Sequence, residues 1–123
     1  MKVFRYNIAM CGCTLMDELE GLVMNYKNIK IYVDDVRDIP EGYIGTRSVN
    51  QTIDFIKEIE SHDGSIDVID LDHDLGDYAY DGGDAIKILD FLVERETFYP
   101  IAFHTANPVG RANMERMIRR FWP

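Results

Sequence analysis

The most constraining feature of this sequence is an apolar run that stops abruptly at three polar residues. Residues 66–71 are mostly aliphatic, and Asp72, His73 and Asp74 follow them directly. A short, almost continuous apolar run is typical of a buried parallel strand. Ligands of open α/β sheets bind beyond the carboxyl ends of such strands. Because buried charges are costly unless they are paired, these three side chains predict a functional site. Asp70, inside the run, has no assigned role.

Two other apolar runs in the chain also end in polar residues. Residues 29–33 lead into Asp34 and Asp35, and residues 101–103 lead into a third polar group. That third group contains His104, Thr105 and Asn107. Because the carboxyl ends of parallel strands lie at one edge of a sheet, we expect all three groups to converge there.

The segments between these strands carry helix signals. Ser48 and Gln51 form a capping-box pattern, which predicts that a helix begins there. A second amphipathic pattern begins at Asp84. The last helix is expected to begin at Asn107 and Pro108, because Asn caps helices and Pro has a preset φ at the first helical position.

The segment between the first strand and the first helix has no helix signal. Pro40 and Gly42 lie too close together for a good helix, so we expect a loop followed by a short strand at residues 43–47. Strands that alternate with helices imply a mostly parallel sheet. In a chain of 123 residues, we therefore expect one α/β domain, with an open sheet in three layers and helices on both faces.

The first 28 residues are harder to assign. Alternating apolar residues at 4–10 suit an edge strand, and apolar residues at helical spacing over 16–23 suit a short helix. Alternatively, this segment is an upstream extension, and the functional chain begins near Met24. We assign no chemistry to residues 1–28 and expect the α/β domain to cover residues 29–123.

Composition limits the classes of partner. The chain has 13 basic and 22 acidic residues, a formal charge of −9, which argues against bulk nucleic-acid binding. No apolar run approaches the roughly 20 residues that span a bilayer, and no clear signal peptide is present. Cys11 and Cys13 have too few neighbouring ligands for a structural zinc site, so we expect reduced thiols. We therefore expect a cytoplasmic protein. A small phosphate ligand remains possible if a divalent metal or a few local arginines offset the acidic charge, and the oligomeric state stays open.

The acidic residues at the strand ends suit a divalent metal. Asp34, Asp35 and Asp72 would supply carboxylate oxygens, which Mg²⁺ and Mn²⁺ prefer. Such an ion would offset the repulsion between the carboxylates and attract a phosphate. Arg37 and Arg111 flank the cluster and could bind phosphate oxygens in a bidentate manner. The start of the last helix would add backbone dipoles pointing at the same place.

These motifs resemble those of response-regulator receiver domains. The matching residues are Asp34 and Asp35 after the first strand, and residues 67–75 around the central one. The resemblance implies a flavodoxin-like fold with strands in the order 2-1-3-4, numbered along the chain. It also implies that the second acid of the pair, Asp35, and the strand-end Asp72 hold Mg²⁺, that Asp72 accepts a phosphoryl group, and that Thr105 is the hydroxyl position.

The sequence also departs from ordinary receiver domains. The first helix is reduced to a loop, the last strand with its lysine is missing, and His73, Asp74 and His104 are additional polar residues. These departures resemble a divergent branch, the cyclic-phosphate-processing receiver-like domains, over roughly residues 29–121. The matching motifs are Asp34-Asp35-x-Arg37-x-x-Pro40, Leu71-Asp72-His73-Asp74-Leu75-Gly76 and His104-Thr105-x-Asn107-Pro108. The branch implies action on cyclic phosphates of nucleotides or RNA ends.

The residues suggest a mechanism for opening a cyclic phosphodiester. His73 and His104 would supply a base and an acid near neutral pH, and a metal on Asp35 and Asp72 would stabilise charge. The catalytic group would be His73, His104, Asp72 and Asp74. The phosphate would be bound by Arg37, Thr105, Asn107 and Arg111.

Other interpretations stay open. His73 and His104 could be structural histidines with hydrogen-bonded rings, and Thr105 could stabilise a turn. Asn107 is expected to cap the last helix whatever else it does. The whole domain could instead be a degenerate receiver that is phosphorylated on Asp72, or a non-catalytic domain that binds a phosphate or a nucleotide.

Overall fold

The computed structural model describes residues 14–15 and 25–123. The strand expected at 4–10, the helix expected at 16–23, and the cysteines at positions 11 and 13 lie outside the described residues. Within the described ranges, no helix is long and apolar enough to cross a membrane.

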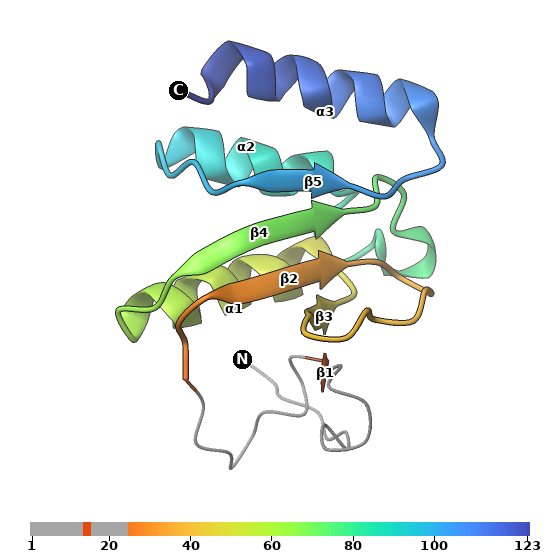
Figure 1. Cartoon of the computed structure of the whole chain (residues 1–123). Helices are drawn as coiled ribbons and strands as arrows, with labels where there is room; N and C mark the ends of the chain where they lie inside the picture. The colour runs from red at the N-terminus through yellow and green to blue at the C-terminus, as the bar shows by residue number, and fades with distance from the viewer. Residues whose placement is uncertain (1–13, 16–24) are drawn as a thin grey trace.

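The centre of the molecule is a parallel sheet with the strand order β1-β3-β2-β4-β5 (Figure 1). The strands are β1 (Thr14–Leu15), β2 (Ile29–Val33), β3 (Ile44–Thr46), β4 (Ile66–Leu71) and β5 (Ile101–Phe103). The last four have the order predicted by the resemblance to receiver domains, 2-1-3-4 along the chain, so the receiver-like α/β fold is confirmed. β1 adds a short edge strand beside β3.

The described residues also form three α helices and one 3₁₀ helix, of which the last along the chain follows β5. They are α1 (Val49–Ser61), η2 (Gly76–Tyr78), α2 (Ile86–Glu94) and α3 (Pro108–Phe121). The Ser48 hydroxyl accepts the Gln51 N–H at the start of α1, as its capping pattern predicts. α2 begins two residues later than expected, because the Asp84 carboxylate accepts the Leu75 N–H and belongs to the preceding turn.

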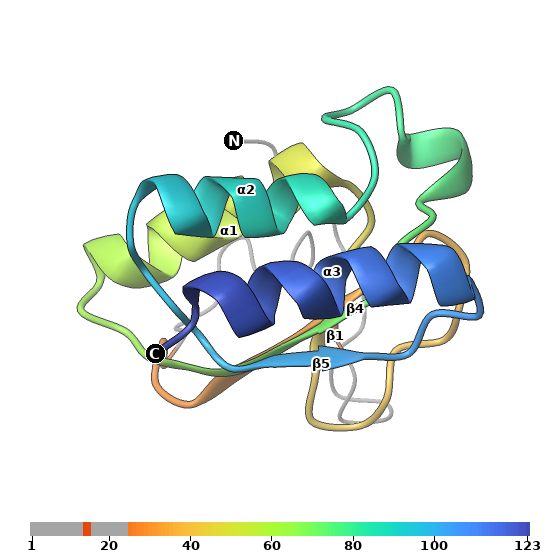
Figure 2. The same ribbon diagram turned by 90° about the horizontal axis from the view of Figure 1, so that it is seen from above.

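The helices lie on one face of the sheet, with α2 between α1 and α3 (Figure 2). The predicted three layers are therefore wrong for the described residues, which form two. The reason is the topology of the sheet. The connections from β3 to β4, through α1, and from β4 to β5, through α2, run in the same direction along the sheet. Because such crossovers are right-handed, both helices lie on the same face. Only the connection from β2 to β3 runs the opposite way, and it is the expected loop rather than a helix.

The two faces of the sheet differ accordingly. The face beneath the helices is the core, with fully buried aliphatic side chains such as Ile31 and Ile69. The opposite face carries Lys30, Tyr32 and Asp70, and register places Tyr32 directly beside Asp70. The acidic side chain of Asp70, near the end of β4, is thus tolerated, because it lies on the face that no described helix covers.

Candidate functional site

The loop after β2 is built around the carboxylate of Asp34, which is 1% exposed. Its Oδ1 accepts the backbone N–H groups of Val36, at 2.9 Å, and of Arg37, at 2.8 Å. Arg47 holds the same loop from outside, because its guanidinium donates to the carbonyl oxygens of Asp34 and Arg37. The buried charge is therefore compensated by backbone donors, and the loop that carries it is fixed.

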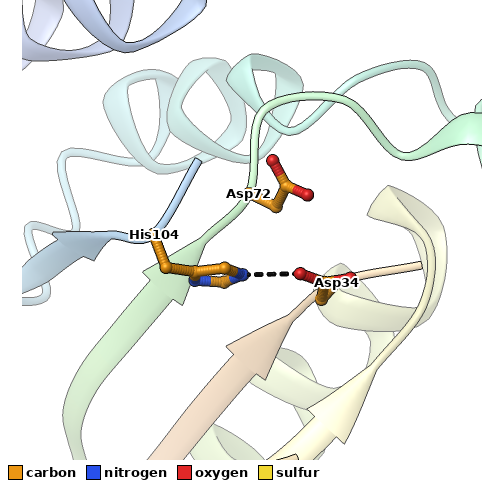
Figure 3. Close-up of side chains that lie close together, drawn as sticks. All are labelled: Asp34, Asp72 and His104. Atoms are coloured by element: carbon orange, nitrogen blue, oxygen red, sulfur yellow. Dashed lines mark hydrogen bonds and ion pairs between the residues drawn. The ribbon is translucent and has the colours of Figure 1, made fainter. Parts of the chain in front are cut away.

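The ring of His104 is held between two carboxylates. Its Nε2 lies 2.8 Å from Asp34 Oδ2, and its Nδ1 lies 2.7 Å from Asp70 Oδ1 (Figure 3 shows the Asp34 contact). Ionised carboxylates only accept hydrogen bonds, so this arrangement favours a ring that is protonated on both nitrogens. Tyr32 stacks on the ring at a centroid distance of 4.1 Å and fixes its plane.

The pKa values of this ion pair move in opposite directions. Burial lowers the pKa of His104, but the hydrogen bonds and charges of Asp70 and Asp34 outweigh it and raise that pKa above its ordinary value. Burial raises the pKa of Asp34, but the backbone N–H groups of Arg37 and Val36, together with His104, outweigh it and lower the pKa. Each partner thus favours the charged form of the other.

Asp72 completes a cluster that could hold a metal. Ligand atoms of Asp34, Asp72 and His104 lie within 4.8 Å of one another, at the ends of β2, β4 and β5 (Figure 3). Asp35 lies next to them: burial and the charges of Asp34 and Asp72 raise its pKa, although a backbone hydrogen bond opposes the shift. Carboxylate oxygens with an imidazole nitrogen, and repulsion between neighbouring carboxylates, fit a divalent cation.

His73 belongs to a second group of side chains at the end of β4. Its Nδ1 lies 2.9 Å from Asp74 Oδ1, and the Asn107 amide donates to both oxygens of Asp74, at 3.2 and 3.1 Å. The hydrogen bond from His73 lowers the pKa of Asp74, against a smaller effect of burial. Nε2 of His73 has no hydrogen-bond partner among the described residues, so this nitrogen is available to a ligand.

The backbone of α3 sets the position of the His73 ring. A Cβ at Gly110 would lie 2.4 Å from His73 Cγ, closer than real side-chain contacts allow. The ring therefore packs directly against the helix backbone, and only glycine permits this approach. Asp84 lies nearby: ligand atoms of His73, Asp74 and Asp84 form a second group that could hold a metal.

The four predicted phosphate-binding residues have different surroundings. Arg37 reaches across the site, with its guanidinium 2.5 Å from the carbonyl oxygen of His104 and 3.7 Å from Asp34 Oδ2. The Thr105 hydroxyl accepts the Asn107 N–H in a turn, and Asn107 caps α3 as predicted. The structure does not bring Arg111 to the carboxylates: it pairs with Glu115, and its guanidinium lies over the ring of Phe103.

Sequence reasoning missed four residues of the site. They are Tyr32, Arg47, Asp70 and Gly110. Asp70 did carry a signal, since an acid within an apolar strand requires a partner. The other three act through contacts between segments far apart in the chain, and no local pattern marks them.

Comparison with known proteins supports the resemblance seen in the motifs. The family model described as "Cyclic-phosphate processing Receiver domain" matches residues 29–120, a range that contains both clusters and all of β2 to β5. Comparisons with curated proteins and with solved structures gave no significant match. With its strand order, its strand-end motifs and a match over most of its length, the chain belongs to the family of cyclic-phosphate processing receiver domains.

Proposed function

We propose that this chain is a metal-assisted phosphoesterase that opens a cyclic phosphate of a nucleotide or of an RNA end. The observation that carries the proposal is the arrangement around β4. His73, with one ring nitrogen bound to Asp74 and the other available, follows directly after Asp72 of the candidate metal cluster. A proton-transfer group and a cation site are thus supplied by consecutive residues at one strand end.

The proposed metal is Mg²⁺ or Mn²⁺. Asp34 and Asp72 would hold it, with Asp35 beside them. When bound, the ion would neutralise these carboxylates and stabilise negative charge on the phosphate oxygens.

His73 is the better placed of the two histidines to move protons. Its Nδ1–H is directed at Asp74, so Nε2 carries the lone pair and would accept a proton from the attacking water. The water oxygen forms a bond to phosphorus, one ring P–O bond breaks, and the released oxygen takes up a proton to give a monoester. His73 then returns its proton to the medium. Asp74 and Asn107 would keep the ring oriented throughout.

Arg37 would stabilise charge, and His104 would hold the site together rather than transfer protons. Both ring nitrogens of His104 donate to carboxylates, which leaves neither for a substrate proton. Arg37 is 43% exposed and uses one terminal nitrogen on the His104 carbonyl, so its remaining N–H groups could bind a phosphate oxygen. Thr105 and Asn107 would position the loop, and Arg111 has no part in the proposed mechanism.

The test is ³¹P NMR of the full chain with a 2′,3′-cyclic nucleotide, in Mg²⁺, in Mn²⁺ and in chelator. Metal-dependent conversion to a monoester, lost in His73→Gln and retained in His62→Gln, supports the proposal. His62 is a matched control because its ring contacts α1 and Tyr26, at the far end of the helix. Binding of the nucleotide without turnover over long incubation would contradict the proposal and favour a non-catalytic binding domain.

A further inference from the structure

The composition of the candidate cation site differs from that implied by the resemblance to receiver domains. The motifs implied three carboxylates, those of Asp34, Asp35 and Asp72. In the structure, the atoms that converge within 4.8 Å come from Asp34, Asp72 and His104, so one donor of the group is an imidazole nitrogen.

The orientation of that imidazole is set from outside the cluster. Asp70 accepts from Nδ1 at 2.7 Å, and this contact turns Nε2 toward Asp34 and Asp72. Asp70 lies on β4, two residues before Asp72, and its side chain is on the face of the sheet that no described helix covers. A carboxylate on the remote nitrogen of a ligating histidine is a common way for proteins to fix the ring and raise its basicity.

The plane of the ring is fixed as well as its direction. Tyr32, paired with Asp70 across β2 and β4, stacks on His104 with an interplanar angle of 9°. His104 is also the first residue after β5, and its backbone N–H donates to the carbonyl of Leu71. Side chains from β2, from the loop after β2, from β4 and from the end of β5 therefore converge to hold Nε2 of His104 beside the carboxylates of Asp34 and Asp72.

We infer that His104 is a ligand of the divalent cation, and that Asp70 is the positioning residue that presents it. The site would then prefer a cation with affinity for imidazole nitrogen, such as Mn²⁺, over Mg²⁺. Mg²⁺ favours oxygen ligands and retains its waters, whereas imidazole suits softer divalent ions. To act as a ligand, Nε2 would have to carry a lone pair, as a neutral imidazole nitrogen does in metal sites. This inference names the metal of the proposed function, but its test needs no turnover.

The probe is MnCl₂ added to the full chain without substrate, followed by electron paramagnetic resonance. The titration gives the affinity, and pulsed measurement of the bound ion reports coupling to a nearby nitrogen nucleus. We expect nitrogen coupling in the wild type and in His73→Gln, and its loss in His104→Gln. Competition with Mg²⁺ should displace Mn²⁺ only at a large excess of Mg²⁺.

Variants of Asp70 test the positioning role. Asp70→Ala should weaken Mn²⁺ binding by about 10- to 100-fold, the range found when such outer carboxylates are removed. Asp70→Asn retains an acceptor oxygen for Nδ1 and should recover part of that loss. Asp67→Asn is the matched control, because it removes an exposed carboxylate from the same strand. Far-ultraviolet circular dichroism of each variant checks that the chain is folded.

Three results would overturn the inference. They are bound Mn²⁺ with no nitrogen coupling, coupling that is lost in His73→Gln but retained in His104→Gln, or an affinity unchanged by Asp70→Ala. The first would assign the cation to oxygens alone, and the second to the group of His73, Asp74 and Asp84. Neither would exclude hydrolysis. Conversely, a protein that binds Mn²⁺ through His104 but never opens a cyclic phosphate would contradict only the proposed function.

Discussion

The two histidines of the site stand at the ends of neighbouring strands, yet their surroundings are opposite. His104, after β5, has a carboxylate on each ring nitrogen and a tyrosine stacked on its face. His73, after β4, has one carboxylate on Nδ1, and its Nε2 is without a partner among the described residues. The same side chain is therefore held on both ring nitrogens in one place and on only one ring nitrogen in the other.

The difference shows that the partners of a histidine, rather than its position, decide its role. Both residues follow apolar strands and lie at the edge where α/β sheets bind ligands. Both rings have a carboxylate on Nδ1, so the contact between His104 Nε2 and Asp34 separates a ring held on both nitrogens from a ring with one available nitrogen.

The largest expected effect is on turnover, and it belongs to His73. His73→Gln should lower kcat for a cyclic nucleotide by about 10²- to 10⁴-fold, because it removes the proposed proton acceptor. The free energy of unfolding should fall less than in His104→Gln, since the one carboxylate that the ring contacts, that of Asp74, is exposed. Steady-state kinetics and urea unfolding of the same preparation measure both quantities, with His62→Gln as control. Undiminished turnover would remove His73 from the mechanism.

The opposite pattern is expected at His104, where the loss is in stability. His104→Gln leaves Asp34, which is 1% exposed, with only the more distant guanidinium of Arg37 as a cationic partner. We expect the free energy of unfolding to fall by about 3 kcal/mol, as for other broken buried ion pairs. Urea unfolding in chelator measures this loss directly. If His73→Gln proves equally destabilising, the contrast between the two histidines is wrong.

Gly110→Ala should change the position of the His73 ring while leaving the imidazole itself intact. The added methyl group displaces the His73 ring from the backbone of α3, and a misplacement of this size can lower kcat by up to about 100-fold. Alanine is the better helix former by about 1 kcal/mol, which offsets part of the packing strain. Activity should therefore fall more than stability. Asn113→Ala, on the exposed side of the same helix, should leave kcat unchanged.

The smallest effect is the pH dependence of the His104 ion pair. Asp34 has a lowered pKa, so its stabilisation is present above its ordinary value of 3.8 and is lost as pH falls through the folded value. His104 has a raised pKa, so its stabilisation is complete below 6.5 and is lost as pH rises through the folded value. The charged groups facing the ring are Asp34, Asp70, Asp72 and Arg37.

The stability difference between wild type and His104→Gln should consequently be largest between pH 3.8 and 6.5, and smaller on either side. Chemical unfolding in chelator across this range measures it. A difference that rises steadily above pH 7 would mean that His104 is neutral in the folded chain.

Much of the fold could be predicted from the sequence, because its signals are local. The capping residues Ser48 and Asn107 begin their helices as expected, and the apolar runs are the predicted strands. The number of layers was not predictable from the same patterns, because it depends on the direction of each crossover. A loop at residues 34–43, rather than a helix, connects β2 to β3. The helical connections from β3 to β4 and from β4 to β5 run in the same direction, so their helices share one face of the sheet.

The site, like the fold, could be predicted only in part. The strand-end residues Asp34, Asp72 and His104 were expected to converge, and the structure brings them together. The pairing of His104 with Asp70 depends on the register of β4 against β5, which no stretch of sequence reveals. The approach of His73 to Gly110 likewise depends on where α3 packs, so the role of this glycine could not be predicted from its place in a helix.

The most direct test of the proposed function offers one sample of metal-loaded protein two phosphorus compounds and follows both by ³¹P NMR. One is a 2′,3′-cyclic nucleotide, and the other is acetyl phosphate, a donor that phosphorylates aspartates in receiver domains. We predict that the cyclic phosphate signal is replaced by that of a monoester, and that no phosphorylated Asp72 accumulates. An unchanged cyclic nucleotide together with a stable acyl phosphate on Asp72 would contradict the account and make the chain a signalling receiver.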